Sequence, residues 1–91
     1  QKDSLDRTIR ERTLNSLGYQ ALRANKHQDA IAIFKINTAL YPTSSNTFDS
    51  LGEAYWQLKD TVNTVANYKK ALSINPENRK AKRFLKKHKL K

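Results

Sequence analysis

Two histidines, His27 and His88, are the only imidazole side chains in this chain of 91 residues, which contains no cysteine. A Ser-His-Asp arrangement needs a histidine placed between a hydroxyl and a carboxylate. His27 lies close to Asp29 in a pattern typical of a helix N-terminus, and His88 lies in a lysine-rich tail. Two isolated histidines without thiolates also disfavour a metal site. The sequence therefore predicts no catalytic residues, no metal site and no cofactor.

Asp49 and Glu53 are one helical turn apart, a spacing at which two carboxylates could work as an acid pair. The polar wall of a groove has the same pattern, and strongly perturbed groups are rare outside functional sites. We therefore expect Asp49 and Glu53 to be solvated wall residues.

Trp56 is the only tryptophan of the chain. Tryptophan is enriched among the residues that dominate binding energies, so Trp56 could anchor a ligand. It could equally pack against neighbouring helices. Both interpretations remain open at the level of sequence.

Basic charge is concentrated at the C-terminus. The segment 77–91 holds eight of the 18 Lys and Arg side chains and one of the eight acids, so it carries +7 of the formal net charge of +10. Such a segment could attract nucleic acid or an anionic surface by releasing counterions. A solvated capping helix has the same composition, and we expect no specific nucleic-acid binding because aromatic residues are scarce there.

The same number of residues, which we call the repeat spacing, separates several pairs of similar residues in the predicted elements that carry these side chains. It separates Gly18 from Gly52, Leu17 from Leu51, Phe34 from Tyr68, and Pro42 from Pro76. Since the chain contains only these two glycines and two prolines, the spacing indicates an internal repeat. Glycine disfavours a helix, so Gly18 and Gly52 predict close crossings between helices.

Hydrophobic periodicity predicts helices over residues 5–24, 28–41, 47–58, 60–74 and, after Pro76, a polar final helix. We expect Asn25 in a left-handed turn, a cap at Ser45 or Asn46, and Asp60 at the start of the fourth helix. The surplus turns of the first helix are expected to shield the end of the stack. The predicted buried faces comprise Ile9, Leu14, Leu17, Ala21 and Ala24; Ala30, Ile31, Phe34, Thr38 and Leu40; and Val65, Tyr68, Ala71 and Leu72.

These features resemble the tetratricopeptide repeat, a 34-residue helix-turn-helix unit whose length equals the repeat spacing of this chain. In the second copy, the matching positions are Phe48, Leu51, Gly52, Tyr55, Tyr68, Ala71 and Pro76. In the first, they are Leu14, Leu17, Gly18, Ala30, Phe34 and Pro42. The resemblance implies one all-α domain over residues 1–91: a superhelix of α-α hairpins with repeats at 11–44 and 45–78 and a basic capping helix at 79–91.

The resemblance also implies a concave groove lined by the first helix of each repeat, which binds a peptide or another protein. Its main candidate binding residues are Asn15, Tyr19, Arg23, Asp49, Glu53, Trp56, Lys80 and Arg83. Further groove positions are Arg12, Ser16, Asn46, Ser50, Gln57, Phe84 and Lys87. Some members of the family grip the C-terminal carboxylate of chaperones, but of the corresponding residues (Asn15, Tyr19, Ser50, Lys80 and Phe84) only Lys80 matches. We therefore do not expect chaperone-tail binding.

Residues 30–78 also resemble the C-terminal repeats of some bacterial serine hydrolases and esterases. That resemblance implies a fragment of a larger protein, in which the repeats would pack on an attached hydrolase. No apolar run approaches the roughly 20 residues of a membrane span. We expect a monomer or weak self-association, while the compartment and the identity of the partner are left open by the sequence.

Overall fold

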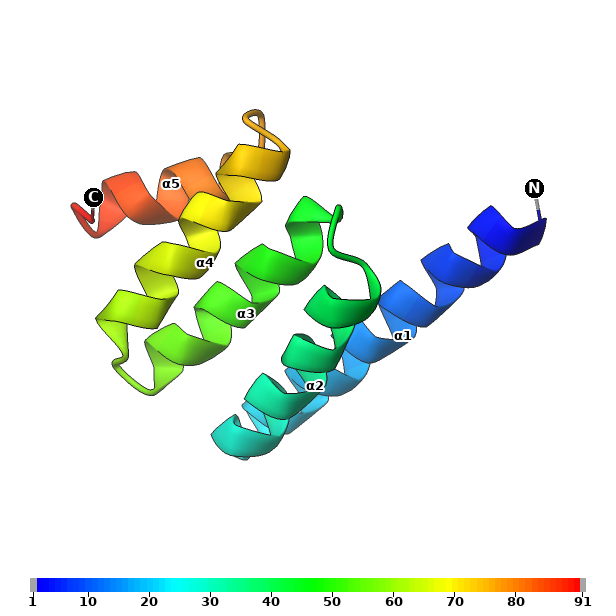
Figure 1. The fold of residues 1–91 in the computed structure, drawn as a ribbon. Helices are drawn as coiled ribbons and strands as arrows, with labels where there is room; N and C mark the ends of the chain where they lie inside the picture. Colours follow the sequence, from blue (N-terminus) through cyan, green and yellow to red (C-terminus); the bar gives the residue numbers. More distant parts are fainter. Residues whose placement is uncertain (1, 91) are drawn as a thin grey trace.

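The computed structural model describes residues 2–90, with side chains from Leu5 onward, and the regular structure within this range is entirely helical. The helices are α1 (Lys2–Arg23), α2 (His27–Leu40), α3 (Ser45–Gln57), α4 (Thr61–Ile74) and α5 (Arg79–Lys87). The pairs α1–α2 and α3–α4 form two hairpins that lie side by side, and α5 packs against α4 (Figure 1). The predicted all-α helical-hairpin fold is confirmed.

Two hydrogen-bonded caps fix where the later helices begin. Asp60 Oδ1 accepts a hydrogen bond from the amide of Asn63 at 3.1 Å, so Asp60 opens α4 as predicted. Asn78 caps α5 in the same way, through the amide of Ala81 at 3.0 Å. The predicted cap at Ser45 or Asn46 is wrong, because α3 already begins at Ser45. Ser45 Oγ instead donates to the backbone carbonyl of Ala71 at 2.8 Å and ties α3 to α4.

The turns inside the two hairpins share one backbone conformation. Asn25, as predicted, and Lys59 both have φ of 61°, and the repeat spacing separates them. For lysine, the left-handed conformation costs about 1 to 2 kcal/mol. The repeat therefore preserves the geometry of the turn even where no glycine is present.

Both glycines lie where the two helices of a hairpin cross. A Cβ atom on Gly18 would overlap the ring of Phe34, and a Cβ atom on Gly52 would lie 3.0 Å from the ring of Tyr68. Phe34 and Tyr68 are fully buried and occupy equivalent positions of the two repeats. Each glycine thus makes room for the large aromatic residue of its partner helix, which confirms the predicted crossings.

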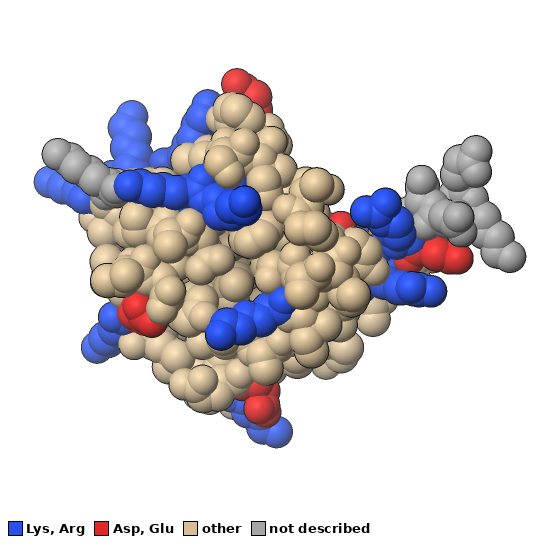
Figure 2. Space-filling view, viewed as in Figure 1, with Lys and Arg blue, Asp and Glu red and all other residues tan. Residues whose placement is uncertain are grey.

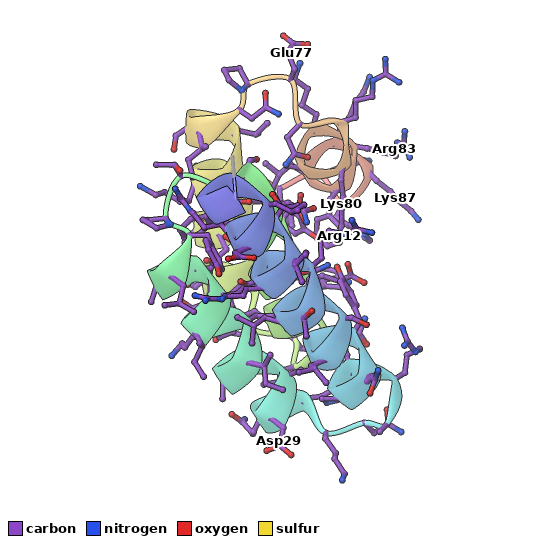
Figure 3. All side chains as sticks on the ribbon, turned by 90° about the vertical axis from the view of Figure 1, so that its right-hand side faces the viewer. Arg12, Asp29, Glu77, Lys80, Arg83 and Lys87 are labelled. Atoms are coloured by element: carbon purple, nitrogen blue, oxygen red, sulfur yellow. The ribbon has the colours of Figure 1, made fainter. Side chains whose placement is uncertain are left out.

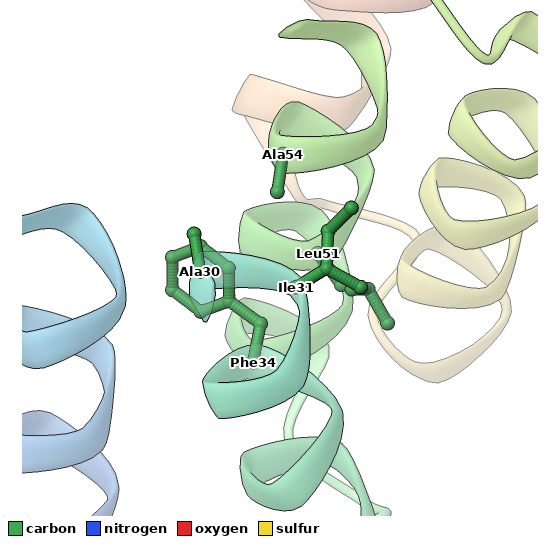
Figure 4. Packing of buried hydrophobic residues seen from close by; sticks show 5 residues of the cluster. All are labelled: Ala30, Ile31, Phe34, Leu51 and Ala54. Atoms are coloured by element: carbon green, nitrogen blue, oxygen red, sulfur yellow. The ribbon is translucent and has the colours of Figure 1, made fainter. Parts of the chain in front are cut away.

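The core consists of two clusters. The first joins α2 to α3 and contains Ala30, Ile31, Phe34, Leu51 and Ala54 (Figure 4). The second contains Tyr68, Ala71 and Ala81, against which Phe84 and Leu85 of α5 pack. Because the first cluster spans both hairpins and the second includes α5, each contact between neighbouring elements buries apolar surface.

Several buried positions are polar and were not predicted. Thr47 and Thr64 are fully buried. The Thr47 hydroxyl donates to the backbone carbonyl of Ser44, and the Thr64 hydroxyl donates to that of Asp60, in each case at the start of the helix that contains the threonine. Asn37 is also fully buried. Its amide donates to the carbonyl of Glu11 at 3.1 Å, while its Oδ1 has no hydrogen-bond partner among the residues that the structure describes.

The first end of the stack exposes apolar side chains. Leu17 is 44% exposed, whereas Leu51, its counterpart in the repeat, is 5% exposed because α2 covers α3. Ile9 and Leu40 are also exposed, contrary to prediction, and the exposed Ala24 lies in the turn after α1. The first turns of α1 project past α2 and do not shield this end (Figure 1). Ile9, Leu14 and Leu40 line a shallow apolar hollow of about 330 Å³ there. We call these three residues and the exposed Leu5 the end surface.

Charge is distributed unevenly over the surface. In the view of Figure 2, the centre of the molecule carries few charged side chains, and Lys and Arg gather toward the α5 end. Within residues 2–90, no helix has the length and hydropathy needed to cross a membrane.

Candidate functional site

The helices α1, α3 and α5 together form one face of the molecule, which we call the inner face. Figure 3 shows Arg12 of α1 on the same side as Lys80, Arg83 and Lys87 of α5. Side-chain contacts connect the three helices directly, since Lys80 bonds to residues of both α1 and α3. Most of the predicted groove residues therefore come together on this face.

Lys80 is the centre of the contacts on the inner face. Its Nζ lies 2.8 Å from Glu53 Oε1 and donates to the hydroxyl of Tyr19 at 2.8 Å. It also lies 3.3 Å from Asp49 Oδ1. The Tyr19 hydroxyl in turn donates to Glu53 Oε1 at 2.9 Å. Lys80 thus places one positive charge between the two predicted wall carboxylates.

A second set of hydrogen bonds extends this cluster along α1. Ser50 Oγ donates to Asn15 Oδ1 at 2.7 Å and lies 3.2 Å from the Tyr19 hydroxyl. Asn15, Tyr19 and Ser50 were all predicted groove residues. The Ser50 hydroxyl therefore links Asn15 to Tyr19.

Asp49 is held from its other side by the start of α5. Its side chain is only 3% exposed, and its Oδ2 accepts a hydrogen bond from Asn78 Nδ2 at 2.9 Å. The same nitrogen donates to Ser45 Oγ at 2.7 Å. Contrary to the expectation of a solvated wall, Asp49 is buried among partners that fix its position.

Burial and pairing shift the protonation equilibria in this cluster. Burial raises the pKa of Asp49 above its ordinary value, although Asn78 and Lys80 act in the opposite direction. Burial alone would lower the pKa of Lys80, but the hydrogen bonds to Glu53 and Tyr19 and the charge of Asp49 together raise it. Burial also raises the pKa of the Tyr19 hydroxyl. Lys80 therefore stays charged at neutral pH and neutralises part of the acidic charge.

Trp56 packs within the molecule. Its ring lies edge-on to Phe84 with centroids 5.2 Å apart, and 4.6 Å from the ring of His88. Phe84 is also stacked on Tyr68 at 4.4 Å. Of the two interpretations of Trp56, the structure thus places it against the capping helix, with part of its surface still accessible beside a hollow that Gln57 also lines.

Three predicted cations of the inner face remain without an acidic partner among the described residues: Arg12, Arg83 and Lys87. Arg23 is exposed in the last turn of α1 and takes no part in the Lys80 cluster. The predicted site residues thus divide into a bonded central set and a solvent-exposed basic set.

A hollow of about 490 Å³ lies beside the bonded cluster, between α1 and the start of α3. Its lining comprises Ile9, Arg12, Thr13, Asn15, Ser16 and Asn46. One guanidinium, several groups that can donate or accept hydrogen bonds, and one apolar side chain therefore face the same space. Such a lining suits an extended peptide better than a compact apolar molecule.

The two histidines lie at helix ends. His88 ends α5 and packs on Trp56 and Phe84, while His27 begins α2. Among the described side chains, no three His, Asp or Glu residues gather as a metal ion would require.

Ser45 and Asn78 are the cluster residues that sequence reasoning missed. The repeat spacing relates Asn78 to Ser44, the N-cap of α3, so its capping role could have been found from the repeat. Its contact with Asp49 had no sequence signal, because it depends on how α5 lies against α3.

Comparison with known proteins adds no assignment: no protein-family model matches the sequence, and no curated protein matches it.

Proposed function

We propose that this chain is a protein-interaction module of the tetratricopeptide type, which binds an extended segment of another protein, or of its own parent chain, on the inner face. The module performs no chemistry on its ligand. Binding depends on the shape and the polar groups that α1, α3 and α5 present together.

The hollow beside the Lys80 cluster is the observation that carries this proposal. Four of its six lining residues, Arg12, Asn15, Ser16 and Asn46, belong to the groove positions predicted from the repeat. The bonded cluster next to it supplies a rigid floor, because each of its side chains is held by a neighbour from another helix. Preorganised polar groups reduce the entropy lost on binding.

The same cluster argues against a chaperone-tail clamp. Asn15, Tyr19, Ser50 and Lys80, four of the five positions compared with that clamp, bond to one another. The fifth, Phe84, packs against Tyr68. Tyr19, Ser50 and Lys80 thus support the face, while Asn15 also lines the hollow.

The end surface favours a second candidate function, packing against an attached domain. Leu5, Ile9 and Leu40 are each more than half exposed. An attached hydrolase or another helical hairpin could cover this surface, as α2 covers α3 inside the chain.

Selection from a displayed library of short random peptides, followed by mapping of the bound peptides, tests the proposal. The isotope-labelled chain is titrated with selected peptides at about 150 mM salt, where exposed charges are screened over about 8 Å. We expect the largest amide chemical-shift changes at Arg12–Ser16 and Asn46.

Changes confined to Leu5 and Leu40, which do not line the hollow, would instead support the packing function. Failure to obtain any peptide that perturbs the inner face would refute the proposed function. Because this experiment reads where a peptide binds, its outcome does not depend on the charge of the peptide.

A further inference from the structure

The acidic side chains of the inner face are already compensated within the fold. Asp49 and Glu53 share Lys80, whose Nζ lies 3.3 Å from Asp49 Oδ1 and 2.8 Å from Glu53 Oε1. Asp49 additionally accepts from Asn78, and Glu53 accepts from Tyr19. A basic group on a ligand would meet two carboxylates that already share one lysine charge. Asp49 and Glu53 therefore offer little attraction to a basic ligand.

The basic side chains around this cluster are in the opposite situation. Arg12, Arg83 and Lys87 are exposed and lie on the same side of the molecule (Figure 3). The ion pairs found among the described residues do not include them. The charge that the inner face offers to a ligand is consequently positive, although its central cluster contains two acids and one lysine.

The residues that line the hollow between α1 and α3 indicate which further groups a ligand of the inner face would carry. Arg12 lines it together with Asn15 and Asn46, whose amides suit a peptide backbone, and with Ile9, which is half exposed. On the premise that the inner face is a peptide-binding surface, we propose that its ligand is an acidic segment carrying an apolar side chain. Its carboxylates pair with Arg12, Arg83 and Lys87, and its apolar side chain covers Ile9.

Guanidinium groups strengthen this assignment because they bind carboxylates through two parallel hydrogen bonds. Arg12 and Arg83 come from different helices, α1 and α5, so a ligand that reaches both must extend from α1 to α5. A peptide segment with two or more separated acidic residues can pair with both arginines, whereas a single carboxylate at a chain end cannot.

The test has two parts. Peptides are selected for binding to the chain, and their net charge is determined. The side chains of the chain that their binding requires are then identified with variants. Enriched peptides are sequenced, and their affinities for three proteins are measured by fluorescence anisotropy at about 150 mM salt. The proteins are the unchanged chain, a groove variant (Arg12→Gln, Arg83→Gln, Lys87→Gln) and a matched variant with the same loss of charge on the other side of α5 and beyond its end (Lys82→Gln, Lys86→Gln, Lys89→Gln).

Both variants are expected to fold, because all six side chains are exposed and, within the described part of the chain, only Lys82 forms an ion pair, with Glu77 at 3.9 Å. Circular dichroism checks this. We expect acidic peptides to be enriched, to bind the groove variant about tenfold or more weakly, and to bind the matched variant within about twofold of the unchanged chain.

Three outcomes would overturn the inference in distinguishable ways. Neutral or basic peptides that map to the inner face would refute the acidic ligand and leave the proposed function intact. Acidic peptides that depend on Lys82, Lys86 and Lys89 would show that tail electrostatics, not the groove, bind them. The absence of any peptide on the inner face would refute the proposed function itself.

Discussion

The two glycines differ in how much space surrounds them. A Cβ atom on Gly18 would overlap the buried ring of Phe34, while a Cβ atom on Gly52 would lie at the limit of contact with Tyr68. We expect Gly18→Ala to lower the free energy of unfolding by about 1 to 3 kcal/mol through overpacking. Gly52→Ala should cost less, because its Cβ atom would lie 3.0 Å from the ring of Tyr68 without overlapping it, and the gain of about 1 kcal/mol in helix propensity offsets more of this smaller strain. Denaturant titration of both variants measures the difference.

Gln20→Ala serves as the control, since Gln20 is exposed on the same helix. Equal stability of the Gly18→Ala variant and the unchanged chain would contradict the interpretation of Gly18 as a contact point. The double variant Gly18→Ala, Phe34→Leu should recover part of the loss if the clash with the ring is its cause.

Lys80 makes stability depend on alkaline pH. Its folded-state pKa is raised above the ordinary value of 10.5, so the folded chain holds this proton more tightly than the unfolded chain. The stabilisation is therefore complete below pH 10.5 and is lost as the pH rises through the folded-state pKa. We expect Lys80→Met to cost about 1 kcal/mol at neutral pH, a modest value because the side chain is 43% exposed.

Urea titrations across the pH range test this prediction. The difference in unfolding free energy between the unchanged chain and Lys80→Met should stay constant up to about pH 10 and shrink above it. Lys86→Met, at an exposed position of the same helix, should show no such trend. A constant difference up to the highest pH at which the chain folds would exclude the assigned role of Lys80.

At the scale of the elements, the caps of α4 and α5 make different numbers of contacts. Asp60 caps α4 at the surface, whereas Asn78 caps α5 and also donates to Ser45 and Asp49. Asp60→Ala should cost about 1 kcal/mol. Asn78→Ala should cost about 2 kcal/mol or more, because it also removes the hydrogen bond to Oδ2 of the buried Asp49. Thermal unfolding of both variants ranks them, and equal losses would contradict the linking role of Asn78.

The helices were predictable to the extent that their determinants are local. The repeat spacing, the two prolines and Asp60 identified the helical hairpins and their order from sequence. Ser45 was misassigned as a cap because a serine before a helix and a serine facing the next helix have the same local sequence. Burial was harder still: Leu17 and Leu51 occupy equivalent positions, and only the neighbour that covers Leu51 distinguishes them.

The same limit applies to the candidate site. The repeat register correctly gathered Asn15, Tyr19, Asp49 and Glu53 on one face. It did not indicate that Lys80, 61 positions after Tyr19, would occupy the acidic centre. That contact depends on the placement of α5, which packing of Ala81 and Phe84 determines and no local pattern encodes.

For the whole molecule, the end surface predicts weak self-association. Leu5 and Ile9 are 61% and 51% exposed on the projecting part of α1. Because this apolar surface is made by only a few side chains, we expect a monomer that associates only at high concentration. Sedimentation velocity should show association that the variant Leu5→Gln, Ile9→Gln lacks and the control Lys35→Gln retains. Strictly monomeric behaviour of the unchanged chain at every concentration would refute this prediction.

The position of Trp56 has a consequence for how unfolding would be observed. As the only tryptophan, in contact with Phe84 and His88 of the terminal segment, it dominates the intrinsic emission of the chain. Its emission therefore reports whether α5 is docked, while circular dichroism at far-ultraviolet wavelengths reports the helices as a whole. If α5 detaches before the hairpins unfold, the two signals will follow different denaturation curves. The fluorescence of Trp56 therefore allows the detachment of α5 to be followed without an added label.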